Sequence, residues 1–350
     1  MSGWADETAA SAMAERLRRA AREPIHLGGE EISRAVSLGL ALGTPGELTV
    51  SELMGRADQA MMQSKARGGD EISVFTADMH RRNGIRTDIE LHLGTAIRNG
   101  SLVLHYQPEV DLVTGSVLGV EALVRWPHPT LGVLQPNAFI DVVEATNLAG
   151  EMGRWVIETG CRQLTAWHQE HPGLRLSVNV SPAQLITLDF VSSVSRILRS
   201  CDLEPEHLTV EITEHALIRD TDQAVATLGG LKDLGVTIAV DDFGTGYSSF
   251  AELKSLPIDT LKIDRGFVRD LGVSAHDLAI VRSIISLAGS FGLQLVAEGV
   301  ETEIAAATLV ALGCTRAQGF LFAKPCPACE IESVLEHGIP TFGKHVPVTR

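Results

Sequence analysis

Polar side chains recur in this chain at the ends of short hydrophobic runs that are rich in β-branched residues. Glu211 follows the run 208–210, and Asp241 follows the run 237–240. The full set is Glu121, Asn179, Glu211, Asp241, Asp242, Lys262, Glu298 and Gln318. Because helix-like segments separate the runs, the pattern predicts carboxylates gathered at one end of a parallel α/β barrel, where such barrels keep their chemistry. Clustered carboxylates that hold a metal pair can cleave phosphodiesters.

Asp241 and Asp242 are the strongest local signal. Two adjacent carboxylates repel each other unless a cation neutralises them, and this pair precedes the flexible sequence Gly244-Thr245-Gly246. Oxygen ligands together with an Asn amide favour Mg²⁺ or Mn²⁺ over zinc. An isolated Asp-Asp pair more often caps a helix or faces solvent, but the other strand-end acids favour the metal interpretation here.

Two basic residues lie close to these acids in the sequence. Lys262 precedes Asp264 by two positions, so strand alternation places both on one face, where Asp264 can hold the ammonium. Lys262 is therefore a candidate to orient an attacking water and to offset developing charge. Arg125 follows Glu121 by four positions and is a candidate phosphate fork. A surface ion pair or a rim salt bridge is the plain alternative for each.

Composition limits the class of protein. The 350 residues are 45% hydrophobic and 21% charged, which allows a large barrel plus a smaller piece. A net charge of −15 argues against a nucleic-acid polymer as partner, since phosphate contacts need a basic face. No apolar run is long enough to span a bilayer, and residues 1–10 lack signal-peptide features. With five scattered cysteines, we expect a reduced, cytoplasmic chain whose parent protein can be larger or membrane-attached.

From residue 102 onward, strand-like and helix-like segments alternate. Strands are expected at 102–107, 117–124, 174–180, 207–212, 236–241, 259–263, 293–297 and 315–319. Helices are expected near 150–169, 187–200, 220–234, 274–291 and 302–312. This alternation indicates βα units, but the loop between the first two strands is too short for a helical crossover. The predicted fold class is therefore α/β, a TIM-like (β/α)8 barrel with one antiparallel strand.

The N-terminal part has a different pattern and too few elements for a complete α/β domain. Helices are expected at 9–22 and 53–65, and a short strand at 72–75. Two strand-like runs within 25–42 around Gly28-Gly29 predict a β-hairpin. A polar helix follows, with Ile89, Leu93 and Ile97 at helical spacing as candidate buried positions. The expected divisions are a partial α/β segment at 1–76, a linker helix at 77–98, a barrel at 99–340 and a tail at 341–350.

Ordered motifs from about Ile89 to about His337 resemble the EAL family of cyclic di-GMP phosphodiesterases. The matching segments are Tyr106–Pro108, Glu121–Trp126, Asn179–Ser181, Glu211–Glu214, Asp241–Ser249, Leu261–Asp264, Glu298–Thr302 and Gln318–Phe320. The resemblance implies hydrolysis of cyclic di-GMP to linear pGpG by a two-metal mechanism, which lowers the level of this second messenger. It also implies a homodimer.

The resemblance further implies roles for individual residues. The ligands of two Mg²⁺ or Mn²⁺ ions would be Glu121, Asn179, Glu211, Asp241 and Asp242. Around them, Glu298 would join the metal or its water shell, Lys262 would contact the nucleophilic water, and Gln318 would help to position that water or the metal. On the substrate, Gln107 would meet a guanine and Arg125 a phosphate. Glu214 and Glu301 would steady the loop after Asp242, which in the family links metal binding to the dimer interface.

The N-terminal segment resembles the last portion of a GGDEF diguanylate cyclase domain, on Ser37–Ala41 and Ala57–Lys65. The string Gly68–Glu71 is interpreted as a chance turn, because the signature hairpin of that family precedes these segments. Since the upstream strands are absent, no cyclase site is expected. Two alternatives stay open for the barrel: a non-catalytic cyclic di-GMP receptor module, and a metallo-hydrolase that acts on another phosphodiester.

Overall fold

The computed structural model describes residues 7–27, 30–32, 35–44, 46–66, 69–214, 221–245 and 256–339. The chain divides into two compact units, Met1–His92 and Leu93–Arg350, and each is described by itself. Among the described residues, no helix is both long enough and apolar enough to cross a membrane.

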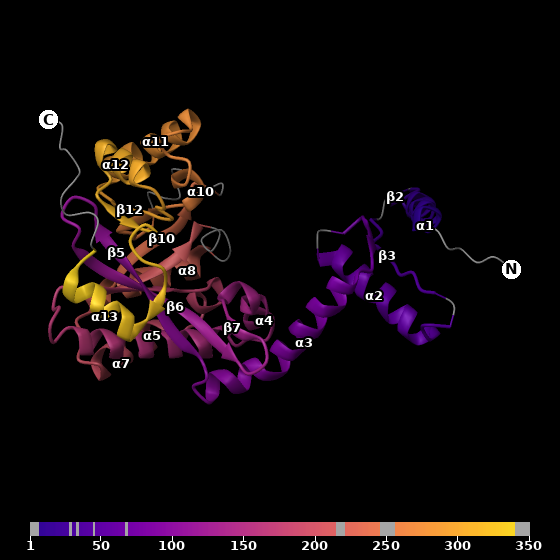
Figure 1. Ribbon diagram of the computed structural model, residues 1–350, viewed down its shortest axis with the longest axis horizontal. Coiled ribbons are helices and arrows are strands. Elements are labelled where there is room, and N and C mark those ends of the chain that lie inside the picture. The colour runs from indigo at the N-terminus through magenta and orange to yellow at the C-terminus, as the bar shows by residue number, and fades with distance from the viewer. Residues whose placement is uncertain are drawn as a thin grey trace. The chain divides into compact units, whose positions relative to one another are not determined.

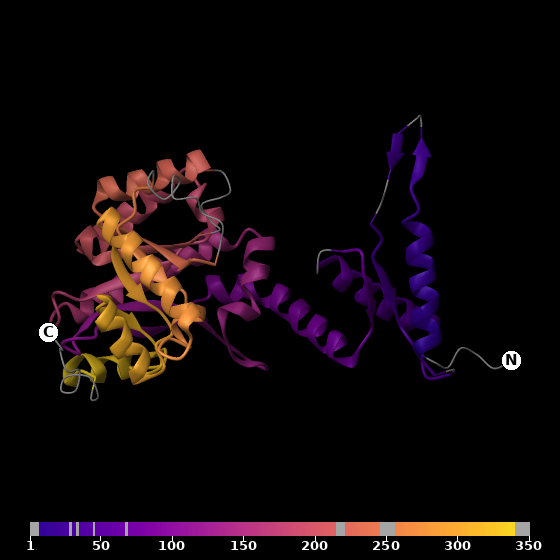
Figure 2. The same cartoon turned by 90° about the horizontal axis from the view of Figure 1, so that it is seen from above.

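Among its described residues, the first unit contains two helices, two small sheets and the larger part of a third helix that continues into the second unit. Its elements are α1 (Glu7–Ala21), β1 (Ile25–Leu27), β2 (Glu30–Ile32), β3 (Leu38–Leu40), α2 (Val50–Ala66) and β4 (Ile72–Val74). Strands β1 and β2 pair antiparallel as a hairpin (Figure 2), which confirms that prediction, although Gly28 and Gly29 lie outside the described residues. Strands β3 and β4 pair in parallel.

Strand β3 lies directly against helix α2. A Cβ at Gly39 would lie 1.9 Å from the carbonyl oxygen of Ala57 and 2.4 Å from the nitrogen of Met61, so only glycine allows this approach. The Arg18 guanidinium of α1 donates to the Asp70 carbonyl at 3.0 Å and to its carboxylate at 3.1 Å. These contacts join α1, α2 and the turn before β4 into one small unit.

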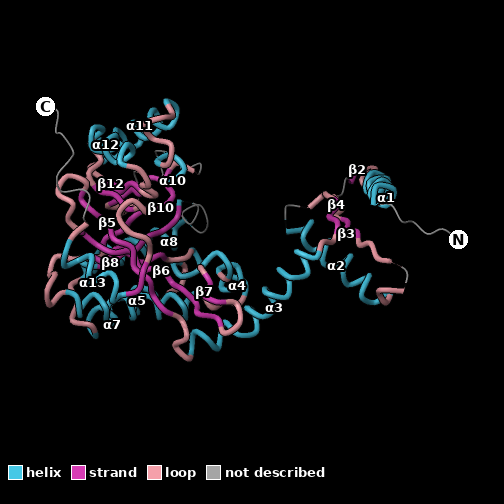
Figure 3. Tube along the Cα trace, viewed as in Figure 1, coloured by secondary structure: helices cyan, strands magenta, loops and turns pink. Residues whose placement is uncertain are grey.

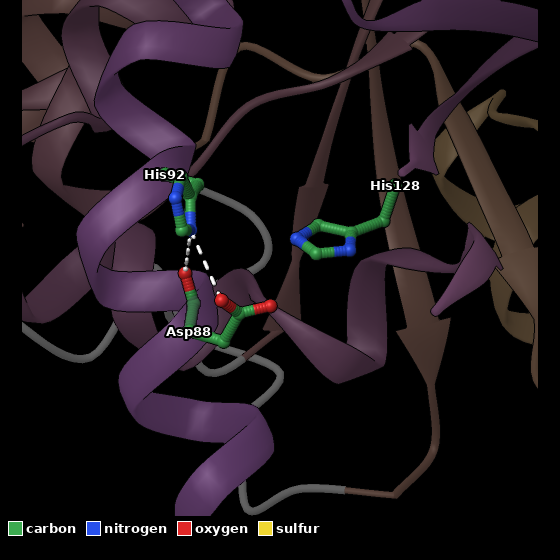
Figure 4. Close-up of side chains that lie close together, drawn as sticks. All are labelled: Asp88, His92 and His128. Carbon is green, nitrogen blue, oxygen red and sulfur yellow. Dashed lines mark hydrogen bonds and ion pairs between the residues drawn. The ribbon is translucent and has the colours of Figure 1, made fainter. Parts of the chain in front are cut away.

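Helix α3 (Ala77–Arg98) includes the boundary between the two units. Ile89, Leu93 and Ile97 are buried, as their helical spacing predicts. On an exposed turn, the His92 Nδ1 lies 2.8 Å from the Asp88 carbonyl oxygen and 3.2 Å from its carboxylate (Figure 4). Pairs four residues apart stabilise a helix by about 0.2–0.5 kcal/mol each.

Eight strands of the second unit close into a barrel (Figure 3). They are β5 (Val103–Asp111), β6 (Val117–His128), β8 (Arg175–Asn179), β9 (Leu208–Thr213), β10 (Thr237–Phe243), β11 (Thr260–Ile263), β12 (Gln294–Ala297) and β13 (Arg316–Gln318). The ring runs β5-β13-β12-β11-β10-β9-β8-β6 and closes through the β5–β6 pairing. Strand β5 is antiparallel to both neighbours, while the other neighbouring pairs are parallel. The predicted TIM-like barrel with one antiparallel strand is confirmed.

Two short strands extend the sheet beyond the barrel. Strand β7 (Gly132–Leu134) pairs with the end of β6, and β14 (Cys326–Pro327) pairs with β5. Because of β7, β6 continues to His128 instead of ending near residue 124 as predicted. Pro127 is tolerated there because β6 pairs only with β7 beyond Arg125 among the described residues, so one side of the strand needs no N–H.

Helices cover the outside of the barrel (Figure 1). They are α4 (Ile140–Ala145), α5 (Ala149–Trp167), α6 (Pro182–Leu185), α7 (Phe190–Ser200), α8 (Thr221–Leu234), α10 (Arg265–Val268), α11 (Ala275–Phe291), α12 (Glu303–Leu312) and α13 (Ala328–His337), with 3₁₀ turns at Pro136–Ala138 and Pro205–His207. Local chemistry sets the bounds: the Ser274 hydroxyl accepts from the Asp277 N–H at 3.2 Å, and α11 ends at Gly292 with φ +68°.

Barrel strands are buried on both faces, since one face lines the interior and the other packs under helices. In β9 every residue from Leu208 to Ile212 is buried, including Glu211. The apolar residues around it explain why the strand forms, and the single acid within it is the exception that needs a function.

A close backbone contact fixes the end of β13. A Cβ at Gly319 would lie 2.1 Å from the carbonyl oxygen of Val300 and 2.3 Å from its nitrogen. We expect Gly319→Ala to lower the free energy of unfolding by about 1–3 kcal/mol, because the two backbone segments must separate. Urea denaturation followed by circular dichroism measures this.

Gly229→Ala is the matched control. Gly229 lies inside α8 with open space at its Cβ position, so the change should raise stability by about 0.5–1 kcal/mol. Equal effects of the two substitutions would contradict the packing described at Gly319.

Candidate active site

The predicted residues come together at one end of the barrel. Asn179 and Gln318 are the last residues of β8 and β13, while Glu298 directly follows β12. Glu121 lies in the middle of the extended β6, where it pairs opposite Gln107 of β5. Because the parallel strands share a direction, their carboxyl ends meet, and the side chains converge as the sequence predicts.

Lys262 of β11 lies at the centre of this acidic cluster, with a side chain that is 2% exposed. Its Nζ lies 2.7 Å from a Glu211 carboxylate oxygen and 2.5 Å from one of Glu298. Oxygens of Glu121 and Asp241 each lie 3.8 Å away. One ammonium thus faces carboxylates from four different strands or strand ends.

The predicted partnership of Lys262 with Asp264 is wrong. The Asp264 carboxylate instead accepts from the Gly266 N–H at 2.8 Å and caps helix α10. It also interacts with the side chain of Asp242 and helps to raise the pKa of that carboxyl. Asp264 directly follows the end of β11, so its backbone no longer continues the alternation on which the prediction relied.

Side-chain amides connect the other half of the site. The Gln318 Nε2 donates to Glu121 at 2.5 Å and to the Gln107 Oε1 at 2.9 Å. The Asn179 Nδ2 donates to the other Glu121 oxygen at 2.6 Å. The Gln107 Nε2 donates to the Ala323 carbonyl at 3.0 Å. Glu121 is therefore fixed by two amides.

Asp241, Asp242 and Glu298 each offer an oxygen within 4.8 Å of the others. Asp242 has φ +54°, a left-handed conformation that aspartate adopts more readily than most residues. Its N–H donates to the Asp241 carboxylate at 2.9 Å. This turn directs two successive carboxyl groups toward one region.

The electrostatics of the cluster reflect an excess of negative charge. Burial, assisted by neighbouring acids, raises the pKa of Glu298 to about 8, that of Asp242 to about 6, and that of Glu211 above its usual range. Burial alone would lower the pKa of Lys262, but the surrounding carboxylates raise it well above its usual range. Five carboxyl groups and one ammonium leave a surplus that divalent cations with oxygen ligands fit.

Arg125 and Gln107 lie on neighbouring strands of this end of the barrel. Arg125 is 9% exposed, its Nη1 donates to the Val124 carbonyl at 2.8 Å, and burial lowers its pKa. It shares a strand face with Glu121, which lies four positions earlier. Gln107 contacts Gln318 of the site, and the charge of Glu121 acts on Arg125.

The two residues predicted to steady the loop after Asp242 differ in their surroundings. Glu214 is 2% exposed and accepts from the Gly244 N–H at 3.1 Å, so it contacts the start of that loop. Glu301 is exposed. The rest of the loop, residues 246–255, lies outside the described residues.

Fold and site define a TIM-like barrel with a buried acidic centre at the carboxyl ends of its strands. A family model of the EAL domain matches residues 91–325, and the chain belongs to that family. A model of the diguanylate cyclase GGDEF domain matches residues 3–71. The N-terminus therefore carries a partial GGDEF region.

Similar sequences and structures extend over most of the chain. An uncharacterized protein of Mycobacterium tuberculosis is 51% identical over 322 residues, which are 91% of this chain and 52% of that protein. The bifunctional diguanylate cyclase/cyclic di-GMP phosphodiesterase MucR of Pseudomonas aeruginosa is 40% identical over 320 residues, 91% of this chain and 47% of MucR. The chain spans about half the length of the curated relatives that it matches.

Solved structures agree with the barrel. The MucR phosphodiesterase of P. aeruginosa in complex with cyclic di-GMP is 42% identical, with a TM-score of 0.66 over 70% of this chain and 99% of that one. The EAL domain of Mycobacterium smegmatis DcpA is 48% identical, with a TM-score of 0.59 over 69% and 98%.

Removal of the central ammonium should destabilise the metal-free protein. We expect Lys262→Met to lower the free energy of unfolding by about 3–5 kcal/mol at a pH above the Glu298 pKa of about 8, because the ionised carboxylates around it lose their counter-charge. The loss should shrink as the pH falls through about 8, since Glu298 then takes up a proton in either protein. Urea denaturation at a series of pH values in EDTA measures both effects.

Lys232→Met provides a matched control outside the cluster. Lys232 pairs with Asp259 at 2.7 Å, but the two side chains are 34% and 32% exposed. We expect a loss of about 1 kcal/mol or less. A comparable loss in both variants would show that the Lys262 cluster has no special energetic role.

Binding of Mn²⁺ should release protons. In the metal-free protein, the raised pKa values of Asp242 (about 6) and Glu298 (about 8) keep these carboxyl groups partly protonated near neutrality. Cations compete with those protons, so affinity should rise with pH up to about pH 8. Calorimetric titration in buffers of different ionisation enthalpy measures the proton release. An affinity for Mn²⁺ that does not change with pH, together with no proton release, would contradict the predicted competition between cations and protons.

Proposed function

We propose that the chain hydrolyses one phosphodiester bond of cyclic di-GMP in line, gives linear pGpG, and so lowers the level of this second messenger. The observation that carries the proposal is the buried acidic cluster around Lys262 at the carboxyl ends of the strands. Further support comes from the P. aeruginosa relatives MucR and NbdA, which are named cyclic di-GMP phosphodiesterases and are 40% and 38% identical.

The donor set fits two Mg²⁺ or Mn²⁺ ions. The proposed ligands are Glu121, Asn179, Glu211, Asp241 and Asp242, with Glu298 at the metal or its water shell. Bound ions would polarise the phosphoryl oxygens and lower the pKa of a bound water. The chain supplies oxygen donors, which hard cations prefer as ligands. The single ammonium neutralises only part of the negative charge of the carboxylates, so the site can still bind divalent cations.

Lys262 acts on charge and position in this proposal. Its pKa lies well above the usual range, so the group stays protonated and does not serve as a base. A fixed ammonium at this position orients the attacking water and offsets the charge that develops on the phosphoryl oxygens. Glu211 and Glu298 hold it in place at 2.7 and 2.5 Å.

The remaining residues bind and orient the substrate. Arg125 offers a guanidinium fork to a phosphate, and Gln107 offers its amide to a guanine. Gln318 donates to Gln107 and to Glu121, so it joins the substrate side to the metal side and can help to position the water or the metal. Glu214 and Glu301 would hold the loop after Asp242, with Glu214 contacting Gly244.

We also propose an oligomeric state, a cellular location and a division into domains. We place the chain in the cytoplasm as a homodimer, with the loop after Asp242 linking the interface to the metal ligands. Residues 1–76 form a partial GGDEF-like segment, 77–98 a linker helix, 99–340 the catalytic barrel and 341–350 a tail. Sedimentation of the purified chain tests the dimer.

A nucleotide product assay tests the function. We expect pGpG from cyclic di-GMP with Mg²⁺ or Mn²⁺, and none in EDTA. If the folded protein binds cyclic di-GMP without turnover under both metals, it is a receptor module and the proposed activity is wrong. Preferential turnover of an aryl phosphodiester would indicate a metallo-hydrolase with another substrate.

Substitutions test the assigned roles. We expect Glu121→Gln and Lys262→Ala each to lower kcat by at least about 10²-fold, because each removes charge that the transition state needs. Glu158→Gln is the control for loss of one carboxylate, because Glu158 lies on the outer face of α5 and pairs there with Arg162. Steady-state rates of cyclic di-GMP hydrolysis by the folded variants measure these effects. Full activity in Glu121→Gln or Lys262→Ala would refute the role assigned to that residue.

A further inference from the structure

A second cavity lies at the opposite end of the barrel from the acidic cluster. Its volume is about 780 Å³. It is bounded by the first residues of four barrel strands, Val117, Arg175, Gln294 and Arg316, and by the end of α13. The amino-terminal end of such a barrel does not hold the catalytic residues, so this cavity is separate from the proposed active site.

The charged groups that line this cavity are basic. They are Arg175, Arg316, His171 and His337, with no carboxylate among the described lining residues. This is unusual in a chain with a net charge of −15. The polar part of the wall is completed by the hydroxyls of Thr114 and Ser116, which lie in the turn between β5 and β6.

The two arginines differ in their partners. The Arg316 Nε donates to Glu109 at 2.5 Å, and its Nη1 donates to Gln294, so its charge is compensated within the protein. Arg175 is half-buried and makes no ion pair in the part of the chain that the structure describes. The Arg175 guanidinium is therefore the basic group of this wall that can pair with an anion in the cavity.

The pKa of the neighbouring His207 is lowered, chiefly by burial and by the ring of His168, whose centroid lies 4.5 Å away. Arg175 acts in the same direction, but its contribution is smaller than the opposing one of Glu206, which is not among the residues that line the cavity.

The cavity also has an apolar wall. Leu118, Pro172 and Leu335 contribute to its lining beside the basic groups. Its volume falls within the range of small-molecule sites and exceeds that of a single phosphate. A guanidinium fork binds phosphate oxygens in pairs, and the leucine side chains offer contact area to an organic group attached to that phosphate.

We propose that this amino-terminal cavity binds a small organic phosphate, with the phosphate on Arg175 and the organic group against Leu118 and Leu335. The site is independent of the proposed hydrolysis, because it shares no residue with the acidic cluster. Its occupant would bridge β6, β8 and the end of α13.

Calorimetric titration in EDTA tests the site, with phenyl phosphate as the probe and the full chain as the protein. We expect saturable binding that is tighter than that of inorganic phosphate or benzoate. Arg175→Gln should weaken it about tenfold or more, while Arg175→Lys, which keeps the charge, should weaken it less. Arg162→Gln is the control for net charge, since Arg162 lies exposed on α5 and pairs with Glu158.

Absence of saturable binding, or equal affinity in Arg175→Gln and the unmodified chain, would overturn the proposal. Tighter binding of benzoate or of inorganic phosphate would overturn the choice of an organic phosphate. A second experiment uses the unmodified protein and so does not depend on whether the Arg175 variants fold.

Phenyl phosphate should protect Arg175 from chemical modification by phenylglyoxal, which peptide mass spectrometry detects. An unchanged rate of modification at Arg175 would also refute the site.

Discussion

The buried ammonium of Lys262 is the interaction on which the acidic end of the barrel depends. It is 2% exposed and lies within 4 Å of carboxylates from β6, β9, β10 and the end of β12. Without a counter-charge these acids would repel one another or take up protons. Lysine resolves part of this conflict, while burial, assisted by the neighbouring acids, still raises the pKa values of Glu211 and Glu298 in the metal-free protein. The same surplus of charge suits the site to divalent cations.

Glu121 links this charge cluster to the residues that we propose bind the substrate. It contacts the ammonium at 3.8 Å on one side and receives amides from Asn179 and Gln318 on the other. Gln318 also donates to Gln107, which pairs opposite Glu121 across the antiparallel β5–β6 ladder. The one antiparallel strand of the barrel is thus the element that brings the proposed guanine contact next to a proposed metal ligand.

Much of this arrangement follows from the sequence, for physical reasons. Short apolar runs separated by helix-length segments predict parallel strands, and a parallel barrel brings strand ends together whatever the connecting helices are. The loop before residue 117 is too short for a crossover, which predicted the antiparallel strand correctly. Contacts between side chains that are far apart in the sequence could not be predicted in this way. Gln318 and Gln107 are 211 positions apart, and strand register decides their contact. Asp264 was assigned to Lys262 from alternation, but the chain turns into α10 there and the carboxylate caps that helix.

The central claim is that the carboxylates around Lys262 hold a pair of divalent cations. Anomalous diffraction from crystals of the chain grown with Mn²⁺ tests this most directly. The account predicts two manganese peaks at the carboxyl ends of the strands, in contact with Glu121, Asn179, Glu211, Asp241 and Asp242. Peaks confined to other surfaces, or an acidic centre that stays free of manganese at saturating concentration, would contradict it.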